Sequence, residues 1–192
     1  MALVVALLLT AAPAWAAVAL VDDATFGPDS VIRDLDNGQD FLNLSPTEPY
    51  TYPEVLARLA PGQEFDGWRV AELAEMEALC DAAGVVDGSA DVSVLADTAQ
   101  LRDWFGEVLT SSTHVYCRGL ILEPAVGEPE AQQAFHISIS RYDPPTAEGD
   151  IRGYGRHIWA NECTYLIRIP EPVSLGLLAG AMLLVPRRRR TG

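Results

Sequence analysis

Three aspartates lie close together near the start of the chain, at Asp34, Asp36 and Asp40. Several carboxylates on a tight loop are the kind of oxygen ligands that calcium prefers. Their spacing does not follow the EF-hand rule, because the sixth position of the loop is not Gly and the twelfth is not Glu. The Asn-Gly pair at residues 37–38 is typical of a tight turn. We therefore favour a solvated turn and keep a calcium site as the alternative.

The histidines His114, His136 and His157 are the next candidates for chemistry. No two of them have the spacing of a zinc motif, so they would share a metal only if the fold brought them together. The hydroxyls of residues 111–113 precede His114 directly, but the chain has no Gly-x-Ser-x-Gly nucleophile turn. We assign no catalytic residue and no metal ligand here, and expect hydrogen-bonded residues on or beside strands.

The pair Trp68-Arg69 has two interpretations. A tryptophan can stack on a sugar ring, or it can lie in the core while the neighbouring arginine pairs with a carboxylate. Trp68 stands directly before a segment with helical periodicity, which favours the core. The expected partner of Arg69 is then Asp66 or Glu72.

Tyr142, Tyr154 and Trp159 are set among glycines and prolines, which is typical of exposed loops. These aromatic side chains are the better candidates for a surface that faces carbohydrate. The many carboxylates define no glycosidase pair, because their number alone does not place two of them at a working distance. The sequence favours a non-enzymatic protein, with an extracellular hydrolase as the alternative.

The three cysteines Cys80, Cys117 and Cys163 lack the spacing of a metal-binding pair. In an oxidising compartment they are expected to form one disulfide and leave one thiol, and the sequence leaves all three pairings open. Cys80 falls near the end of an amphipathic helical segment, where it can pack as a small apolar side chain. Our interpretation is a buried, reduced Cys80 and a Cys117–Cys163 disulfide.

The C-terminal segment 169–192 combines three features in order. Pro170-Glu171-Pro172 keeps the backbone extended, because proline does not fit the interior of a helix. The uncharged run 173–185 would span about 20 Å as a helix, against roughly 30 Å for the hydrocarbon core of a bilayer. A basic block follows, a strong signal for a cytoplasmic C-terminus, formed by Arg187, Arg188, Arg189 and Arg190. The sequence predicts a short membrane-inserted helix with an accessible extended segment outside the bilayer.

An apolar run, residues 2–12, also begins the chain. Ala14 and Ala16 follow it at the positions that signal peptidase reads. No Lys or Arg precedes the run, which departs from the usual signal peptide and allows for a true start further upstream. We predict a signal peptide, residues 1–16, that is cleaved after Ala16, and hence export of the chain.

The segment 17–172, which ends just before the uncharged run, is strongly acidic, and the chain has no lysine. All 27 Asp and Glu side chains but only nine of the 13 arginines fall in this segment, which leaves a net charge of about −18. Binding to nucleic acid or to an anionic membrane surface needs basic patches. The composition therefore argues against both and suits a soluble exported protein.

The C-terminal segment resembles the PEP-CTERM sorting signal of Gram-negative bacteria, the substrate tail of the exosortase system. The resemblance covers Ile169 to Arg190 with all three features in order, and Pro186 is its one departure. It implies exosortase as a partner, transient inner-membrane insertion, and cleavage near Pro170-Glu171-Pro172. The released protein is then expected at the cell surface or in the extracellular exopolysaccharide matrix. There we expect an adhesive or structural component that contacts glycans, with a matrix-acting hydrolase or a calcium-binding module as alternatives.

Periodicity in the body predicts a single α+β domain, residues 17–168, flanked by the two cleavable apolar signals. A strand at 41–44, a helix from Tyr52 to Leu59, a strand at 67–70 and a helix from Glu72 to Ala83 come first. Gly84 is expected to cap the second helix, and a third short helix is expected at 100–109. Strand patterns follow at 115–121, 135–141, 151–158 and 163–169. Helices early and an antiparallel sheet late are therefore the expected architecture.

The stretch from Asn37 to Leu79 is similar to segments that recur in PEP-CTERM proteins. Its Gly67-Trp68-Arg69 also resembles the Trp-Arg-Leu-Pro-Thr stretch of the C-type-lectin-like fold, although residues 70–72 read Val-Ala-Glu instead of Leu-Pro-Thr. The closing strand 163–168 resembles the last core strand of such domains. The resemblance implies a C-type-lectin-like domain. The paired cysteines of the formylglycine-generating enzymes of that fold have no counterpart motif here, so their activity is not implied.

Overall fold

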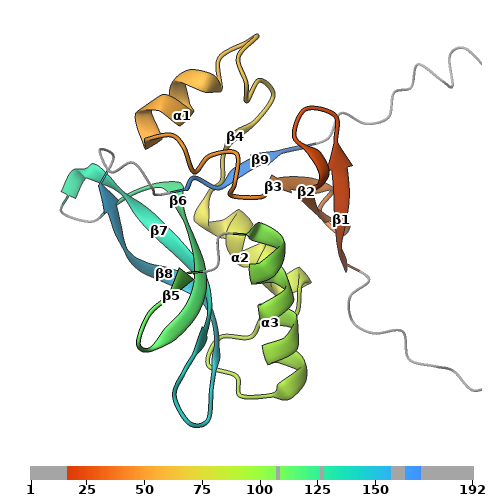
Figure 1. The fold of residues 1–192 in the computed structure, drawn as a ribbon, viewed down its shortest axis with the longest axis vertical. Coiled ribbons are helices and arrows are strands. Elements are labelled where there is room, and N and C mark those ends of the chain that lie inside the picture. The colour runs from red at the N-terminus through yellow and green to blue at the C-terminus, as the bar shows by residue number, and fades with distance from the viewer. Residues whose placement is uncertain (1–16, 107–108, 126–127, 157–162, 170–192) are drawn as a thin grey trace, which may run out of the picture.

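The computed structural model describes residues 17–106, 109–125, 128–156 and 163–169, and its first sheet gathers strands from both ends of this stretch (Figure 1). The strands, in their order across the sheet, are β1 (Val18–Asp23), β2 (Gly27–Asp34), β3 (Gln39–Leu42), β9 (Leu166–Arg168) and β4 (Arg69–Val70). All neighbours in this sheet are antiparallel. The last of the described strands, β9, is thus an interior strand, so the sheet is complete only when distant segments meet.

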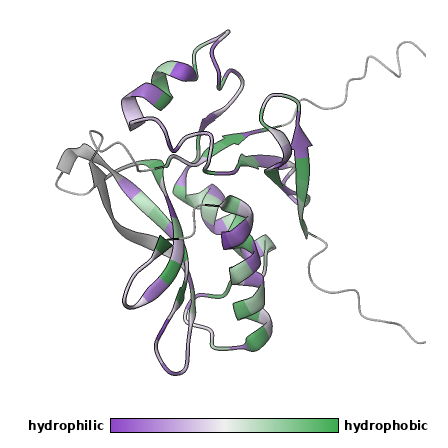
Figure 2. Ribbon diagram, viewed as in Figure 1, coloured by the Kyte–Doolittle hydropathy of each residue, from purple (hydrophilic) through white to green (hydrophobic). Residues whose placement is uncertain are grey.

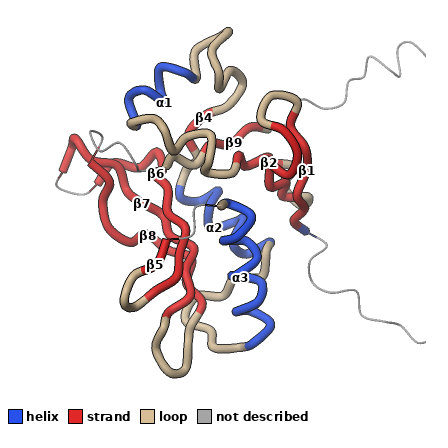
Figure 3. The backbone as a smooth tube through the Cα atoms, viewed as in Figure 1, coloured by secondary structure: helices blue, strands red, loops and turns tan. Residues whose placement is uncertain are grey.

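The second sheet is a meander of four antiparallel strands in chain order. They are β5 (Leu109–Thr110), β6 (His114–Ala125), β7 (Glu128–Ser140) and β8 (Ala147–Arg156). Of the four predicted late strands, the first falls within β6 and the second overlaps β7. The third overlaps β8, which begins four residues earlier than expected, and the fourth contains β9 of the first sheet. The described residues form an α+β domain with two antiparallel sheets, and the predicted fold class is confirmed (Figure 3).

Three helices occur among the described residues: α1 (Tyr52–Arg58), α2 (Leu73–Ala82) and α3 (Val92–Phe105). The α2 helix ends in a Schellman motif, in which the backbone N–H of Val85 donates to the Cys80 carbonyl at 2.9 Å and that of Gly84 to the Asp81 carbonyl at 3.0 Å. Gly84 adopts a φ of 78°, as this motif requires. The predicted ends of α2 are therefore right within a residue or two.

The buried apolar residues pack into two clusters. Figure 2 colours the ribbon by hydropathy and shows hydrophobic residues along the strands and helices. In the first sheet, Ile32, Phe41 and Ile167 belong to the cluster that includes α2 and α3. Their neighbours Val31, Leu42 and Leu166 belong to the cluster around α1 and Trp68. Because successive strand residues face opposite sides, this sheet is covered on both faces.

Some expectations need correction. The β1–β2 hairpin was not expected from the sequence. The α3 helix begins at Val92 instead of residue 100, because the Asp91 side chain caps it by accepting from the Ser93 N–H at 2.8 Å. In α1, Tyr52 and Val55 are buried, whereas Leu56 is 43% exposed. No helix in the described part of the chain is long and apolar enough to cross a bilayer. The predicted membrane helix at 173–185 lies outside the described residues.

Candidate functional site

One face of the second sheet carries a band of polar side chains. Residues such as Cys117, Phe135 and Ile137 face α2 and α3 and are fully buried. The alternate residues face the other way, and the strand register sets Tyr116 opposite Ser138, and Ser138 opposite Glu148. We call this band the polar strip; it consists of His114, Tyr116, Arg118, His136, Ser138, Ser140 and Glu148.

An imidazole and a carboxylate form the most sheltered pair of the polar strip. The Nε2 atom of His114 lies 3.1 Å from Oε2 of Glu148, and their side chains are 17% and 11% exposed. The Ser138 hydroxyl donates to the same carboxylate oxygen at 3.0 Å. Protonation of the imidazole would turn this contact into an ion pair. The pair can therefore accept and donate hydrogen bonds within one small area.

Aromatic rings flank this pair. Tyr116 stacks on the ring of His136, with ring centroids 5.1 Å apart and planes 5° from parallel. Tyr142, just beyond β7, is 61% exposed and meets the His114 ring edge-on, with a centroid distance of 6.0 Å. The expectation that Tyr142 is exposed is confirmed. An exposed ring beside a carboxylate and an imidazole is a combination suited to binding polar ligands that have an apolar face.

The hydroxyls next to His114 mainly stabilise the turn between β5 and β6. Ser111 Oγ accepts from the backbone N–H groups of Thr113 at 3.2 Å and His114 at 2.9 Å. The Thr113 hydroxyl lies 2.8 Å from Nδ1 of His114. The structure thus places a hydroxyl, an imidazole and a carboxylate in series, although two of the three are sequence neighbours.

The acidic turn forms no metal cluster. Asp34 is fully buried, and its carboxylate accepts from the backbone N–H groups of Asp36 and Asn37 at 2.9 and 3.0 Å. Asp40 is also fully buried and pairs with Arg33 at 2.6 Å. Only Asp36 is solvated, so the solvated-turn interpretation is wrong for the other two carboxylates. Among the described residues, no three His, Cys, Asp or Glu side chains are placed to hold a metal ion.

Trp68 lies in the core, as expected, at 6% exposed. The guanidinium carbon of Arg168 lies 4.3 Å from the centroid of the Trp68 ring. The partner of Arg69 is Glu75, at 2.8 Å, and not Asp66 or Glu72. The first turn of α2 brings Glu75 back over β4, next to Arg69. The spacing of these two residues along the sequence did not indicate this contact.

The expected disulfide is not formed, because all three cysteines are free and buried. The N–H of Leu120 donates to the carbonyl of Cys163 at 2.8 Å, so Cys163 lies near residues 119–120. Cys117 lies two residues further along β6, and the two segments are one strand spacing apart. The Cα atoms of Cys117 and Cys163 are therefore about 8 Å apart, beyond the roughly 7 Å that a disulfide tolerates. Cys117 instead has its sulfur 3.6 Å from the Tyr165 hydroxyl.

The remaining predicted sites lie outside the described residues. They are the sorting motif Pro170, Glu171 and Pro172, the block Arg187 to Arg190, the cleavage residues Ala14 and Ala16, and also His157 and Trp159. The Tyr154 side chain is likewise not described. Glu148 was missed by sequence reasoning. The alternation of His136, Ser138 and Ser140 with apolar residues was the one signal that a polar face crossed this strand.

No known family model, no curated protein and no solved structure matches this chain. The C-type-lectin-like fold and the PEP-CTERM relationship therefore stay predictions.

Proposed function

We propose that this protein is exported, inserted transiently in the inner membrane by its C-terminal helix, and cut by exosortase near Pro170-Glu171-Pro172. The released domain then acts at the cell surface or in the exopolysaccharide matrix as an adhesive or structural, non-enzymatic component. The observation that carries this proposal is the order of extended motif, apolar run and arginine block over residues 169–190. The acidic, lysine-free body is compatible with it, since such a surface stays soluble outside the cell.

Glycans are the proposed ligands, and the polar strip with Tyr142 is the proposed binding surface. An exposed tyrosine ring can pack on the apolar face of a sugar. The carboxylate of Glu148 and the imidazole of His114, 3.1 Å apart, can bind sugar hydroxyls beside it. Because Ser138 also donates to Glu148, the carboxylate is already oriented before a ligand arrives.

Retention on immobilised exopolysaccharide from the native host tests the glycan site. We expect Tyr142→Ala and Glu148→Gln each to weaken retention about three- to tenfold, because one stacking contact or one charged acceptor is lost. Val92→Ala is the matched control, since Val92 is 81% exposed on α3, away from the polar strip. Unchanged retention of both site variants would place glycan binding elsewhere or exclude it.

A matrix-acting hydrolase is the second candidate, and the series Thr113, His114 and Glu148 is the observation that favours it. The discriminating measurement is release of reducing ends from the same polysaccharide. Binding without turnover supports the adhesive proposal. Turnover that Glu148→Gln abolishes supports the hydrolase.

A further inference from the structure

The first sheet ends at β1, which lies at the outer side of the domain (Figure 1). In the described part of the chain, no strand pairs with the outer side of β1. Residues 17–21 read Ala-Val-Ala-Leu-Val, and charged residues begin only at Asp22. We call residues 17–21 the open edge. Native proteins usually protect such an edge with lysine, proline or very short strands, and the open edge has none of these.

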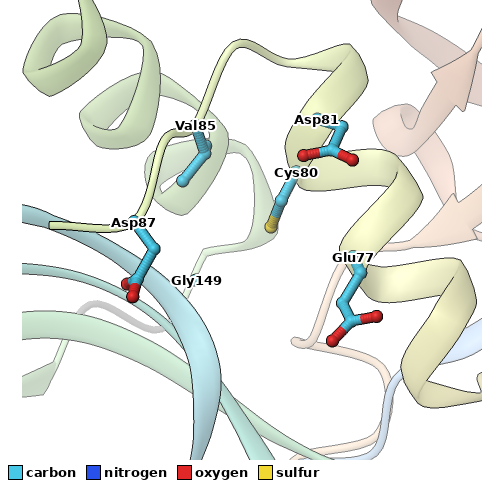
Figure 4. A pocket seen from close by; sticks show the side chains of 6 residues that line it. All are labelled: Glu77, Cys80, Asp81, Val85, Asp87 and Gly149. Atoms are coloured by element: carbon cyan, nitrogen blue, oxygen red, sulfur yellow. The ribbon is translucent and has the colours of Figure 1, made fainter. Parts of the chain in front are cut away.

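The other edges of the two sheets are protected. The edge strands β4 and β5 have only two residues each. The start of β8 is covered by a loop, because the N–H of Gly88 donates to the Ala147 carbonyl and the N–H of Ala147 to the Ser89 carbonyl, both at 2.8 Å. Three carboxylates line a small cavity beside Gly149 of the same strand (Figure 4), and charged residues follow at 150, 152 and 156. Among the described strands, β1 is therefore the one with an unprotected edge.

The hydrogen-bond pattern of the β1–β2 ladder shows which backbone groups point outward. The N–H of Leu35 donates to the carbonyl of Ala17 at 2.7 Å, so residue 17 bonds to the β2 segment. Hydrogen-bonded pairs alternate along an antiparallel ladder, and every second residue from Ala17 on therefore bonds to β2 as well. The N–H and C=O groups of Val18 and Leu20 consequently point away from β2, toward the free side of the open edge.

These outward groups are complementary to themselves. When two open edges lie antiparallel about a two-fold axis at Ala19, Val18 of one copy is opposite Leu20 of the other, and about four hydrogen bonds join the copies. Leu20 and Val21 pack against opposite clusters and are only partly buried, so a neighbouring strand would cover both. We propose that the open edge pairs with the same edge of a second copy of this chain, which joins two five-stranded sheets into one.

Charge placement favours a second copy as the occupant. The pairing about Ala19 sets uncharged residues against uncharged residues over the whole open edge, and Asp22 falls just outside it. With cleavage after Ala16, the α-ammonium group of Ala17 lies beside Asp22 of the second copy, a favourable contact of opposite charges. This one contact rests on the proposed processing, and the strand pairing does not. A two-fold contact uses both open edges, so association stops at the dimer.

Sedimentation velocity of the protein from its native host tests the proposal, with the intact mass recorded on the same sample. We expect a monomer–dimer equilibrium over roughly 1–200 µM, because a short strand interface is weak. The dimer fraction should be larger at about 0.5 M salt than at about 0.05 M, because each body carries about −18 and salt screens the repulsion. A monomer under all these conditions would overturn the proposal. The mass reports on processing and the sedimentation on pairing, so either can fail without the other.

Substitutions at the two-fold axis locate the interface. Ala19→Glu sets two carboxylates directly opposite each other and should lower the association constant at least about fivefold. Ala19→Val should keep or strengthen the dimer, because a β-branched residue favours a strand. Ala57→Glu is the matched control, since it adds the same charge at an exposed position of α1. No loss with Ala19→Glu, or an equal loss with Ala57→Glu, would overturn pairing through the open edge. Loss of the dimer in Ala19→Val would do the same.

Discussion

Gly119 allows a tyrosine to lie in the centre of the core. A Cβ atom at position 119 would come within 2.7 Å of the Tyr165 ring, which is fully buried and packs edge-on against Phe105 with centroids 4.9 Å apart. The Tyr165 hydroxyl has the sulfur of Cys117 as its neighbour, and burial raises the pKa of this tyrosine well above its usual value. The cysteines around this ring are therefore packing residues of an apolar interior.

Thiol reactivity tests whether these cysteines are buried and reduced. Burial raises the pKa of Cys117 to about 12, and it raises the pKa of Cys80 as well, so almost no thiolate is present at neutral pH. We expect no reaction of the native protein with Ellman's reagent and reaction of all three cysteines after unfolding in urea. A single thiol in the unfolded protein would reveal a disulfide and contradict the structure.

At the scale of elements, one arginine connects β9 to the rest of the first sheet. Arg168, the last residue of β9, pairs with Asp23 of β1 at 2.6 Å and with Asp40 of β3 at 3.4 Å, and it covers Trp68. Burial alone would raise the pKa of Asp23. Hydrogen bonds from the backbone of Thr25 and Phe26 and from Arg168 outweigh this effect, so the pKa lies below its usual value. The strand that closes the sheet is held by an interaction that depends on an ionised carboxylate.

Acid should weaken this connection. Because the pKa of Asp23 is lower in the folded state, its contribution is present above the unfolded pKa and is lost as pH falls through the folded pKa. We expect Arg168→Met to lower the free energy of unfolding by about 3 kcal/mol at about pH 7, since a buried carboxylate loses its cation. The difference from wild type should narrow at about pH 3, where Asp23 becomes protonated in the variant.

Urea unfolding at the two pH values measures this effect. Arg58→Met is the control, because Arg58 pairs with Glu64 and both side chains are partly exposed, and such a pair contributes little. An equal deficit of Arg168→Met at both pH values would mean that the ion pair with Asp23 does not account for the loss.

At the scale of the whole molecule, the acidic body and the basic tail have opposite charge. Residues 17–172 carry about −18, and the four terminal arginines lie beyond the apolar run. The folded domain reaches Arg168, the end of β9, and Pro170 follows two residues later. In the proposed pathway the protease therefore cuts very close to the folded domain.

Intact-mass measurement of the protein from its native host tests the proposed processing. We expect a chain that begins at Ala17 and ends near residues 170–172, with any glycan visible as added mass. Replacing Pro170 and Pro172 by alanine should leave the C-terminal segment uncut, because the extended accessible conformation is lost. Replacing Arg141, an exposed arginine of the body, should not affect the cut. Recovery of Met1 or of residues 173–192 in the mature wild-type protein would refute the pathway.

Local patterns were sufficient for much of this fold. The spacing of Met76, Leu79 and Cys80 with Gly84 behind them fixed α2, because helical periodicity and a left-handed glycine are local properties. The alternation of apolar residues likewise located β6 and β7. The hairpin of β1 and β2 was missed, since its turn at residues 24–26 lacks the common Asn-Gly signal.

The sequence by itself determined the α+β class, the acidity of the body and the order of features in the C-terminal segment, because each depends on residues close together in the chain. Only the tertiary structure decided which distant groups meet. It set His114 beside Glu148, directed Arg168 to Asp23, and left Cys117 and Cys163 as free thiols. Strand register and helix packing fix these contacts, and neither can be deduced from spacing along one chain.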